Sequence, residues 1–487
     1  MSARETILIT GATGSIGSWM ARTLLESGRS VVALTRADTS LAAKARVLEA
    51  LCIVAAGAQA DHVDVLHGDL CDGPAMEAAA GSCQGVSCII HCAGAMEFRA
   101  ECAELDQQVN VQGTANMLRL AEALHVPFCH FSTAYIAGRR QGRVLESEID
   151  VGQRFNNPYE SSKCQAELLI RDWSLRTGLS AFILRPSIVV GDSREGRIVN
   201  FDGLYNFMRL LDSMSGLSGE REFRVAANCA ATKNIVPVDY LARLAVHILD
   251  AGAPGTYHIT NPHPLRLSAL CDTLAEIFAV RGAKLVSEEE FQSPRPNRFE
   301  SMYQKLASSY APYLAAEPSF DRTNTDAIAE GAGFELPELD AVFFRRLVDY
   351  ARTVKWGKAE RSPGAVTGRE RFVERYFDEF LAKKMHQQLL PNLRRLSANC
   401  RIVVEDIPGR FWALSIDRGC LVEVSQNGLP VECTFLLHSD IFLAIVAGRL
   451  SPQAAFFSKK IDIEGDMEAG LKLATVLATF FRKWPYE

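Results

Sequence analysis

Short apolar runs alternate with amphipathic helical stretches from residue 7 to about residue 257. Apolar runs of this length, separated by helical patterns, indicate parallel strands joined by crossover helices. We therefore predict an α/β fold built on a doubly wound parallel sheet of the Rossmann type. The strands are expected at residues 7–9, 31–34, 63–66, 88–91, 128–131 and 181–184.

The pattern changes in the last part of the chain. Residues 265–352 mix helical periodicity with proline breaks, and we expect them to form most of a substrate cap on a first domain at 1–356. Residues 357–368 are rich in Gly, Lys and Arg, which is typical of a linker. Residues 369–487 combine helices with alternating strands and predict a small α+β domain. In it, Asp440 is expected to cap a helix that ends near Gly448.

Composition narrows the class of protein. The chain has 487 residues, 48% of them hydrophobic and 23% charged, and its net charge of −6 gives no basic surface for nucleic acid. No signal-peptide pattern and no run of about 18 apolar residues is visible. We expect a cytoplasmic protein with at most peripheral membrane contact, and a homodimer stays open. Thirteen cysteines without a C-x-x-C pair indicate free thiols and no metal site.

A glycine-rich turn joins the first predicted strand to a helical pattern. Glycine is needed where the chain leaves a strand sharply, where the backbone approaches a pyrophosphate, and where the helix packs closely on the sheet. The helix N-terminus offers free N–H groups to the phosphates. We interpret the turn as a dinucleotide site, with an ordinary turn as the alternative. The predicted cofactor contacts are Gly11, Thr13, Gly14, Ser15, Ile16 and Gly17.

The next strand ends at Arg36, where dinucleotide sites for NADH carry an acidic residue. A guanidinium at this position can hold a ribose 2′-phosphate through forked hydrogen bonds. NADPH is therefore the predicted cofactor. Asp38 lies close enough in the sequence to keep NADH open.

Tyr159 and Lys163 lie four residues apart, so one face of a helix presents both. A phenol has a pKa near ~10, and a neighbouring ammonium together with a cationic nicotinamide favours its ionised form. Thr133 could bond the substrate oxygen, with Ser132 as the alternative. Asn110 could hold a backbone group and a water beside Lys163, or it could be a helix-surface amide. These residues predict a site for proton transfer.

The order of the motifs resembles that of an extended short-chain dehydrogenase/reductase. The shared motifs are T-G-x-x-G-x-x-G at 10–17, Gly68-Asp69-Leu70, His91-Cys92-Ala93-Gly94, Asn110-Val111-Gln112-Gly113-Thr114, Ser132-Thr133-Ala134-Tyr135, Tyr159-x-x-x-Lys163 and Arg185-Pro186. Residues 131–135, 157–163 and 185–193 are most similar to the fatty acyl-CoA reductase ("male sterility") and thioester reductase branch. Sugar-nucleotide epimerases and hydroxysteroid dehydrogenases share most of these motifs.

This resemblance implies roles for particular residues. Asp69 would contact the adenine, and Leu70, Ala93, Gly94 and Pro186 would line the cofactor together with Tyr159 and Lys163. The catalytic triad would be Thr133, Tyr159 and Lys163.

Residues 372–481 resemble the sterol carrier protein type 2 family, through 440–442, 448–456 and 460–466 followed by an apolar helix. Members of that family enclose an apolar tunnel for acyl chains or other lipids. A collapsed structural or dimerising domain is the alternative.

The two resemblances together predict NADPH-dependent reduction of a fatty acyl thioester to an aldehyde or alcohol. The substrate would be an acyl-CoA or an acyl-carrier-protein thioester, and the C-terminal domain would hold the lipid chain. One alternative is a dehydrogenase or reductase of a lipid or sterol-like alcohol or ketone. Another is a non-catalytic lipid-binding scaffold, against which intact Thr133, Tyr159 and Lys163 argue.

Overall fold

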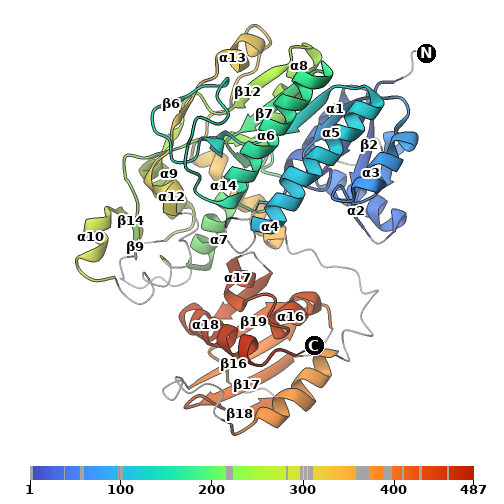
Figure 1. The fold of residues 1–487 in the computed structure, drawn as a ribbon. Coiled ribbons are helices and arrows are strands. Elements are labelled where there is room, and N and C mark those ends of the chain that lie inside the picture. The colour runs from blue at the N-terminus through green and yellow to red at the C-terminus, as the bar shows by residue number, and fades with distance from the viewer. Residues whose placement is uncertain are drawn as a thin grey trace. The chain divides into compact units, whose positions relative to one another are not determined.

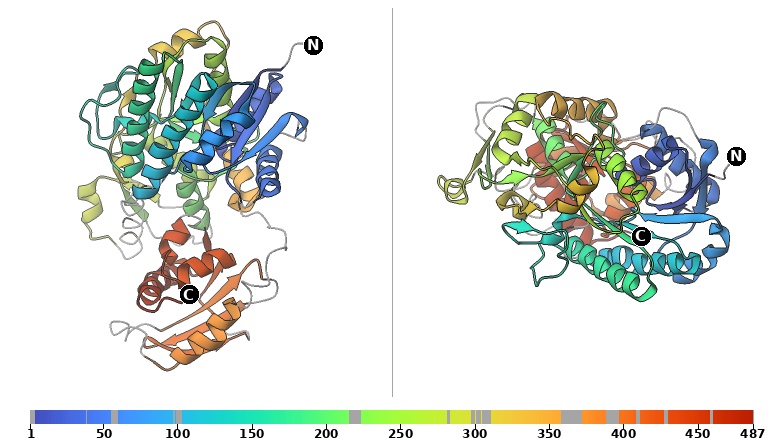
Figure 2. Two further views of the ribbon diagram at one scale, coloured as in Figure 1. Left: turned by 45° about the vertical axis from the view of Figure 1, so that its right-hand side comes forward. Right: turned by 90° about the horizontal axis from the view of Figure 1, so that it is seen from above.

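The chain divides into two compact units, Met1–Lys358 and Ala359–Glu487, shown from blue to light orange and from orange to red in Figures 1 and 2. The computed structural model describes residues 4–37, 39–54, 60–96, 98, 103–214, 223–280, 283–296, 300, 304, 311–357, 372–387, 397–407, 411–426, 430–457 and 460–486. Asp38 and residues 358–368 of the predicted linker lie outside these ranges.

The first unit contains a seven-stranded sheet in which all neighbours are parallel, in the order β12-β7-β5-β4-β1-β2-β3. This confirms the predicted α/β fold class. The chain reverses its direction of travel across the sheet between β1 and β4, and ligands bind at such a switch point. The strands are β1 (Thr6–Thr10), β2 (Ser30–Thr35), β3 (Val63–His67), β4 (Val86–His91), β5 (Phe128–Phe131), β7 (Ala181–Pro186) and β12 (Gly255–Ile259).

Helices cover both faces of this sheet (Figure 1). Successive side chains of a strand point to opposite faces, so Ile7 and Ile9 join one core while Leu8 joins the other. Strands buried on both faces have the continuous apolar pattern seen in the sequence. One face carries α1 (Ser15–Glu26), α2 (Ser40–Val54) and α8 (Val238–Asp250), and the other carries α3 (Gly73–Ala79), α5 (Gly113–Leu124) and α6 (Pro158–Thr177).

A third core forms the cap. We expected most of the cap in residues 265–352, and helix α14 (Ala341–Thr353) of that segment does contribute to this core. The core also includes residues 190–211, which come earlier in the chain. Parallel pairing of β11 with β8 joins these parts to the end of β7. The cap elements are β6 (Arg143–Val144), β8 (Ile188–Val190), α7 (Leu204–Met214), β9 (Phe223–Ala226), β10 (Thr232–Lys233), β11 (Ile235–Pro237), β13 (Leu265–Arg266), α9 (Leu267–Ile277), β14 (Ala283–Val286), α10 (Glu288–Gln292), α12 (Ala311–Ala315), β15 (Ser319–Phe320), α13 (Thr323–Ala329) and α14 (Ala341–Thr353).

The second unit has a five-stranded sheet in the order β18-β17-β16-β19-β20, antiparallel except for the β16–β19 pair. Buried and partly exposed residues alternate along β16, so one face of the strand is covered. The phenyl ring of Phe377 stacks on the buried indole of Trp412 at 4.4 Å. The elements are β16 (Ala398–Val404), β17 (Phe411–Asp417), β18 (Cys420–Ser425), β19 (Cys433–Leu437), α16 (Ser439–Val446), α17 (Pro452–Phe457), β20 (Ile461–Gly465) and α18 (Met467–Lys483).

The prediction that Asp440 caps a helix was wrong. Helix α16 begins at Ser439, so Asp440 lies inside its first turn. The cap comes from Asp406, which follows β16: its carboxylate accepts hydrogen bonds from the Ser439 N–H and the Ser439 hydroxyl, both at 2.7 Å. The cap is thus non-local in sequence. The end of the helix near Gly448, which has φ +72°, agrees with the prediction.

Within the described part of the chain, no helix is both long enough and apolar enough to cross a membrane. The described cysteines are free, and the described His, Cys, Asp and Glu side chains form no cluster that could hold a metal ion. Cys83 and Cys88 are buried in the first unit, while Cys92 is partly buried.

Candidate active site

The glycine-rich turn lies between β1 and α1, beside the end of β4. Gly11 has φ +72°, and a Cβ at this position would lie 2.7 Å from the Ala93 backbone nitrogen. A Cβ on Gly17 would clash with the Gly11 carbonyl oxygen. Each of these two glycines therefore allows a close backbone approach that any side chain would prevent.

The first turn of α1 has the features of a phosphate site. Its N-cap residue, Gly14, makes no side-chain capping bond, and the turn contains no acidic residue. The uncapped N–H groups and the positive end of the helix dipole suit the pyrophosphate of a dinucleotide. The residues present therefore fit the cofactor that the sequence predicts.

The other predicted contacts of this turn have different environments. The Ser15 hydroxyl accepts a hydrogen bond from the Asn200 N–H at 3.0 Å, so a cap loop lies over the turn. Ile16 packs against the hydrophobic core of the sheet, and Thr13 is partly buried. Asn200 has no motif around it, and the sequence alone did not point to it.

Arg36 and Asp69 meet beyond the ends of β2 and β3. A guanidinium nitrogen of Arg36 lies 3.6 Å from Asp69 Oδ2, and the Arg36 side chain is 76% exposed. The second oxygen of Asp69 accepts a hydrogen bond from the Cys71 N–H at 2.9 Å, which fixes the carboxylate. Arg46, on α2, donates to the Arg36 carbonyl oxygen at 2.5 Å and so brings a second guanidinium to this place. No sequence motif pointed to Arg46.

Three other predicted cofactor contacts lie in the loops that follow β3 and β4. The Leu70 carbonyl accepts a hydrogen bond from Asn116 Nδ2 at 2.8 Å, and the Leu70 side chain packs against Gly113. The Ala93 N–H donates to Thr10 Oγ1 at 3.1 Å. Gly94 follows in the same loop.

Tyr159 lies in the first turn of α6 and makes a hydrogen bond with Thr133. Burial raises the pKa of the Tyr159 phenol above its usual value, while the bond to Thr133 lowers it and the nearby Asp106 and Glu160 raise it further. We expected a cation to favour the ionised phenol, but the cost of burying a phenolate outweighs other effects here. The phenol is therefore protonated and can act as a proton donor.

Lys163 lies one turn further along α6 and is 3% exposed. Its ammonium donates to the Phe131 carbonyl oxygen at 2.6 Å and lies 3.1 Å from His130 Nε2. Burial lowers the pKa of Lys163 to about 8, although Glu167 and Cys92 oppose that shift. A Cβ added to Gly94 would lie 3.9 Å from Lys163 Nζ, so the ammonium borders the predicted cofactor loop.

Asn110 is buried in a π-helical turn, Gln107–Gln112, and is not a helix-surface amide. Its side chain accepts from the Ala95 N–H at 2.8 Å and donates to the Ala95 carbonyl at 2.9 Å. It also donates to the Ser162 hydroxyl at 2.9 Å. Asn110 thus holds a backbone group, as predicted for it, and ties the loop after β4 to the helix that carries Tyr159. Single π-helical turns inside α-helices are frequent at functional sites.

Aromatic side chains from three separate segments gather beside Tyr159. The ring of Phe98 lies 6.1 Å from that of Tyr159 and 5.7 Å from that of Tyr313. The Tyr135 ring packs edge-on against Tyr313 at 5.5 Å. The Tyr313 hydroxyl donates to Glu160 at 2.6 Å and accepts from Asn157, the N-cap of α6, at 2.7 Å. An apolar wall therefore borders the predicted catalytic side chains.

Two remaining candidates differ in their roles. Ser132 is buried, and its hydroxyl makes no hydrogen bond to any described residue, so Thr133 is the hydroxyl that bonds Tyr159. Pro186 ends β7 and pairs in register with Ile259 of β12. The preceding Arg185 is fully buried and forms an ion pair with Glu167 at 2.6 Å, which makes it a structural residue.

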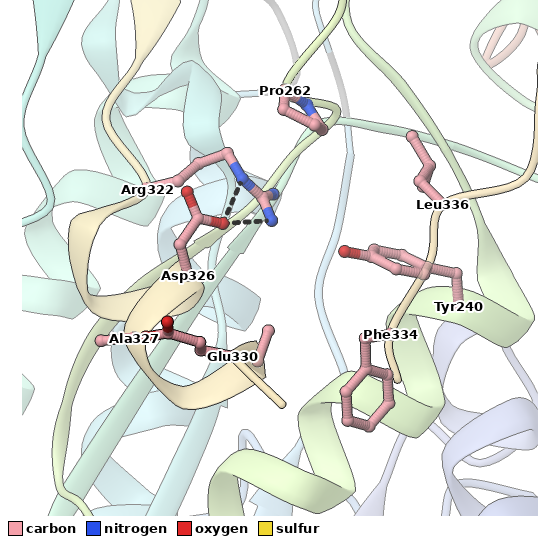
Figure 3. A pocket seen from close by; sticks show the side chains of 9 residues that line it. Tyr240, Pro262, Arg322, Asp326, Ala327, Glu330, Phe334 and Leu336 are labelled. Carbon is pink, nitrogen blue, oxygen red and sulfur yellow. Dashed lines mark hydrogen bonds and ion pairs between the residues drawn. The ribbon is translucent and has the colours of Figure 1, made fainter. Parts of the chain in front are cut away.

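A separate pocket of about 550 Å³ lies between α8 and α13 (Figure 3). Arg322 forms an ion pair with Asp326 on one side of it, and Tyr240 and Pro262 face the same space. None of the predicted site residues lines this pocket. The candidate active site is thus defined by the ends of the strands and not by this pocket.

Comparison with known proteins agrees with this geometry. Residues 9–245 match the male sterility protein family, whose profile describes an NAD-binding domain, and residues 377–478 match the SCP-2 sterol transfer family. A carboxylic acid reductase of Mycobacterium marinum is 27% identical over 293 residues, which are 53% of this chain and 24% of that protein. A 3β-hydroxysteroid dehydrogenase/Δ5→4-isomerase of Mycobacterium tuberculosis is 25% identical over 289 residues, which are 57% of this chain and 71% of that protein.

Among solved structures, the terminal R domain of the myxalamid PKS-NRPS biosynthetic pathway superposes with a TM-score of 0.61 at 21% identity. The match covers 74% of this chain and 93% of that chain and shows a shared fold. The fold and the family match are those of an NAD-binding domain. The chain joins an NAD-binding domain of the male sterility protein family to a C-terminal domain of the SCP-2 sterol transfer family.

Proposed function

We propose that the first unit reduces an apolar acyl thioester with NADPH, giving an aldehyde or alcohol, and that the SCP-2 domain holds the acyl chain. The observation that carries this proposal is the buried Tyr159 phenol, which bonds Thr133 and lies one helical turn from the buried Lys163 ammonium. A carbonyl reduction needs this proton donor beside a hydride donor.

The cofactor would bind along the turn at residues 11–17 and extend toward Gly94 and Lys163. When bound, it supplies the hydride. Arg36 and Arg46 support NADPH over NADH, because two guanidinium groups at the end of β2 can bind a 2′-phosphate. Lys163 would hold a ribose hydroxyl of the nicotinamide half.

Thr133 and Tyr159 would hydrogen-bond the thioester oxygen and stabilise the negative charge that develops on it. The carbonyl carbon gains a hydride, Tyr159 gives its proton to the oxygen, and a tetrahedral hemithioacetal forms. The carbon–sulfur bond then breaks. The thiol leaves with one proton and the aldehyde remains, so each turnover consumes one hydride and one proton.

The apolar wall of Phe98, Tyr135 and Tyr313 supports an apolar acyl substrate, because Phe98 borders Tyr159 and the two tyrosine rings extend the wall from Phe98. An SCP-2 domain on the same chain supports the same substrate class. A tethered lipid holder would raise the local concentration of the acyl chain without adding any contact in the active site. The thioester would be carried by coenzyme A or by a carrier protein.

The test is NADPH oxidation, followed by absorbance, with acyl-CoA substrates of increasing chain length and matched ketones and alcohols. We expect thioester turnover that increases with chain length and falls at least about 100-fold in Tyr159→Phe. This variant should still bind NADPH, because it lacks only the phenolic hydroxyl and keeps the ring and Lys163. If Tyr159→Phe keeps full turnover, the proposed proton donor is wrong.

A second candidate is oxidation or reduction of a lipid alcohol or ketone, including a sterol-like one, by the same residues. The similarity to a 3β-hydroxysteroid dehydrogenase/Δ5→4-isomerase favours it. Turnover of ketones or alcohols without turnover of any thioester would select this function. Binding of NADPH and lipid with no turnover of either class would leave a non-catalytic scaffold.

A further inference from the structure

Lys163 Nζ has two fixed hydrogen-bond partners on one strand. Both the Phe131 carbonyl at 2.6 Å and His130 Nε2 at 3.1 Å belong to β5. An ammonium has three N–H donors in tetrahedral directions. Two of them are therefore committed to β5, and the direction of the third is set by these two bonds.

We propose that His130 is a positioning residue: together with the Phe131 carbonyl it fixes the Lys163 ammonium so that one N–H remains for the cofactor. The proposal rests on the proposed function only in treating Lys163 as the lysine that binds the cofactor. It adds a residue to the site that the sequence motifs did not include.

The His130 ring packs against two neighbouring rings. It stacks on His91 at 5.3 Å and lies nearly parallel to Phe128 at 6.4 Å. Phe128 and His130 are two residues apart on a strand, so they point to the same face of the sheet, where α6 packs. The ring is fully buried, and this packing leaves Nε2 facing the lysine.

His91 links this arrangement to the cofactor loop. Its Nδ1 lies 2.7 Å from Thr10 Oγ1, and its Nε2 lies 3.2 Å from Thr114 Oγ1. Thr10 Oγ1 also accepts the hydrogen bond from the Ala93 N–H. Buried hydrogen bonds together with the stack of His91 on His130 thus connect the predicted cofactor loop to Lys163 across β1, β4 and β5.

The charges around the lysine are consistent with a neutral imidazole. Burial and the Lys163 charge lower the pKa of His91 to about 3, and they lower the pKa of His130 well below its usual value. The other titratable groups that act on Lys163 are Cys92, which follows β4, and Glu167 on α6. A neutral imidazole offers one lone pair, and here Nε2 presents it to the ammonium. Among the described residues, His130 Nδ1 has no hydrogen-bond partner.

This asymmetry of the ring provides a matched pair of variants. The side-chain amide of Gln reaches about as far as Nε2, whereas that of Asn reaches about as far as Nδ1. His130→Gln can therefore keep an acceptor for Lys163, while His130→Asn puts a polar atom where His130 makes no bond. His130→Leu removes both polar atoms.

The experiment measures NADPH affinity by protein fluorescence for the full-length protein and the three variants, from about pH 6 to about pH 9.5. We expect His130→Asn and His130→Leu to bind NADPH about tenfold more weakly, and His130→Gln to stay within about threefold of the wild type. In His130→Leu the alkaline loss of affinity should move down by about one pH unit, because the ammonium loses an acceptor. Thermal unfolding of each variant is measured in parallel.

Unchanged affinity and an unchanged pH profile in His130→Leu would overturn the proposal. The proposal would also be overturned if His130→Gln and His130→Asn lost NADPH affinity equally and in proportion to their loss of thermal stability. A purely structural role of His130 predicts that result. The readout needs no acyl substrate. A wild-type protein that binds NADPH but reduces no thioester would therefore remove the proposed function and leave this inference to be decided by the variants.

Discussion

The Tyr313 hydroxyl donates a hydrogen bond to Glu160 at 2.6 Å, and this bond joins the cap to the residue next to Tyr159. The two residues are 153 positions apart in the chain. Glu160 also accepts hydrogen bonds from the backbone and side chain of Asn156, so the carboxylate is fixed from both sides. The cap is therefore held in contact with the start of helix α6, which carries the predicted proton donor.

Loss of this contact should affect the substrate and not the cofactor. In Tyr313→Phe the ring stays against Phe98 and Tyr135, but the bond to Glu160 is lost. We expect the KM for the acyl substrate to rise about three- to tenfold with NADPH affinity unchanged. Steady-state kinetics and NADPH titration measure the two quantities.

Tyr240→Phe is the matched control for that variant. It removes the same atom from a tyrosine of helix α8 that lines the separate pocket of Figure 3. It should leave both quantities unchanged. An equal rise of KM in both variants would mean that the bond between Tyr313 and Glu160 has no specific part in substrate binding.

Cofactor selectivity should depend on Arg36. Arg36→Ala is expected to weaken NADPH binding about tenfold and to leave NADH binding unchanged, because only NADPH carries the 2′-phosphate. Arg46→Ala should act in the same direction. The measurement is the ratio of kcat/KM for the two cofactors.

Arg171→Ala is a suitable control for that experiment, since Arg171 is exposed on α6 and pairs with Asp172. A preference for NADH in the wild-type protein would contradict the prediction directly. So would an equal loss for both cofactors in Arg36→Ala.

The protonation of Lys163 should appear in the pH dependence of cofactor binding. Its pKa of about 8 means that the ammonium is lost as the pH rises through that value, and NADPH affinity should fall with it. Lys163→Met should bind NADPH weakly at every pH, with a flat profile in this range. A titration of affinity against pH for both proteins decides the point.

The lowered pKa of Lys163 also affects stability, but in the opposite direction: NADPH affinity falls as the pH rises, whereas the free energy of unfolding increases. The unfolded chain keeps the Lys163 proton up to the ordinary value of 10.5, whereas the folded protein releases it near 8. Between these values the unfolded state binds more protons, so the contribution of Lys163 to the free energy of unfolding rises with pH. Relative to the wild type, Lys163→Met should lose this rise in denaturant unfolding experiments.

The C-terminal unit allows a test of its non-local helix cap. Asp406→Ala removes both hydrogen bonds to Ser439 and should lower the free energy of local opening of α16 by about 1–2 kcal/mol. Asp440→Ala removes only a charge from the first turn, with an expected effect of at most about 1 kcal/mol. Hydrogen exchange at the α16 amides measures both, and a larger effect of Asp440→Ala would contradict the assignment of the cap.

Local sequence was enough for six of the seven strands of the parallel sheet and for the glycine turn. Strands buried on both faces have continuous apolar runs. Gly17 is required by its close contact with the Gly11 carbonyl, and Gly11 by its close contact with the Ala93 backbone just after β4. β12 was not predicted, because Gly255–Ile259 contains Gly, Thr and His and becomes a strand only by pairing with β7. Asp406 was missed as a helix cap for a related reason: it lies 33 residues before the Ser439 it caps.

For the candidate site, the spacing of Tyr159 and Lys163 and the hydroxyl of Thr133 could be read from the sequence. The partners of these groups could not. The motifs gave no sign that Lys163 would contact β5, that His130 would be its neighbour, or that Tyr313 would bond Glu160. Periodicity determines which residues share a face of one element, whereas the contacts that set protonation and orientation arise only when separate elements pack together and exclude water.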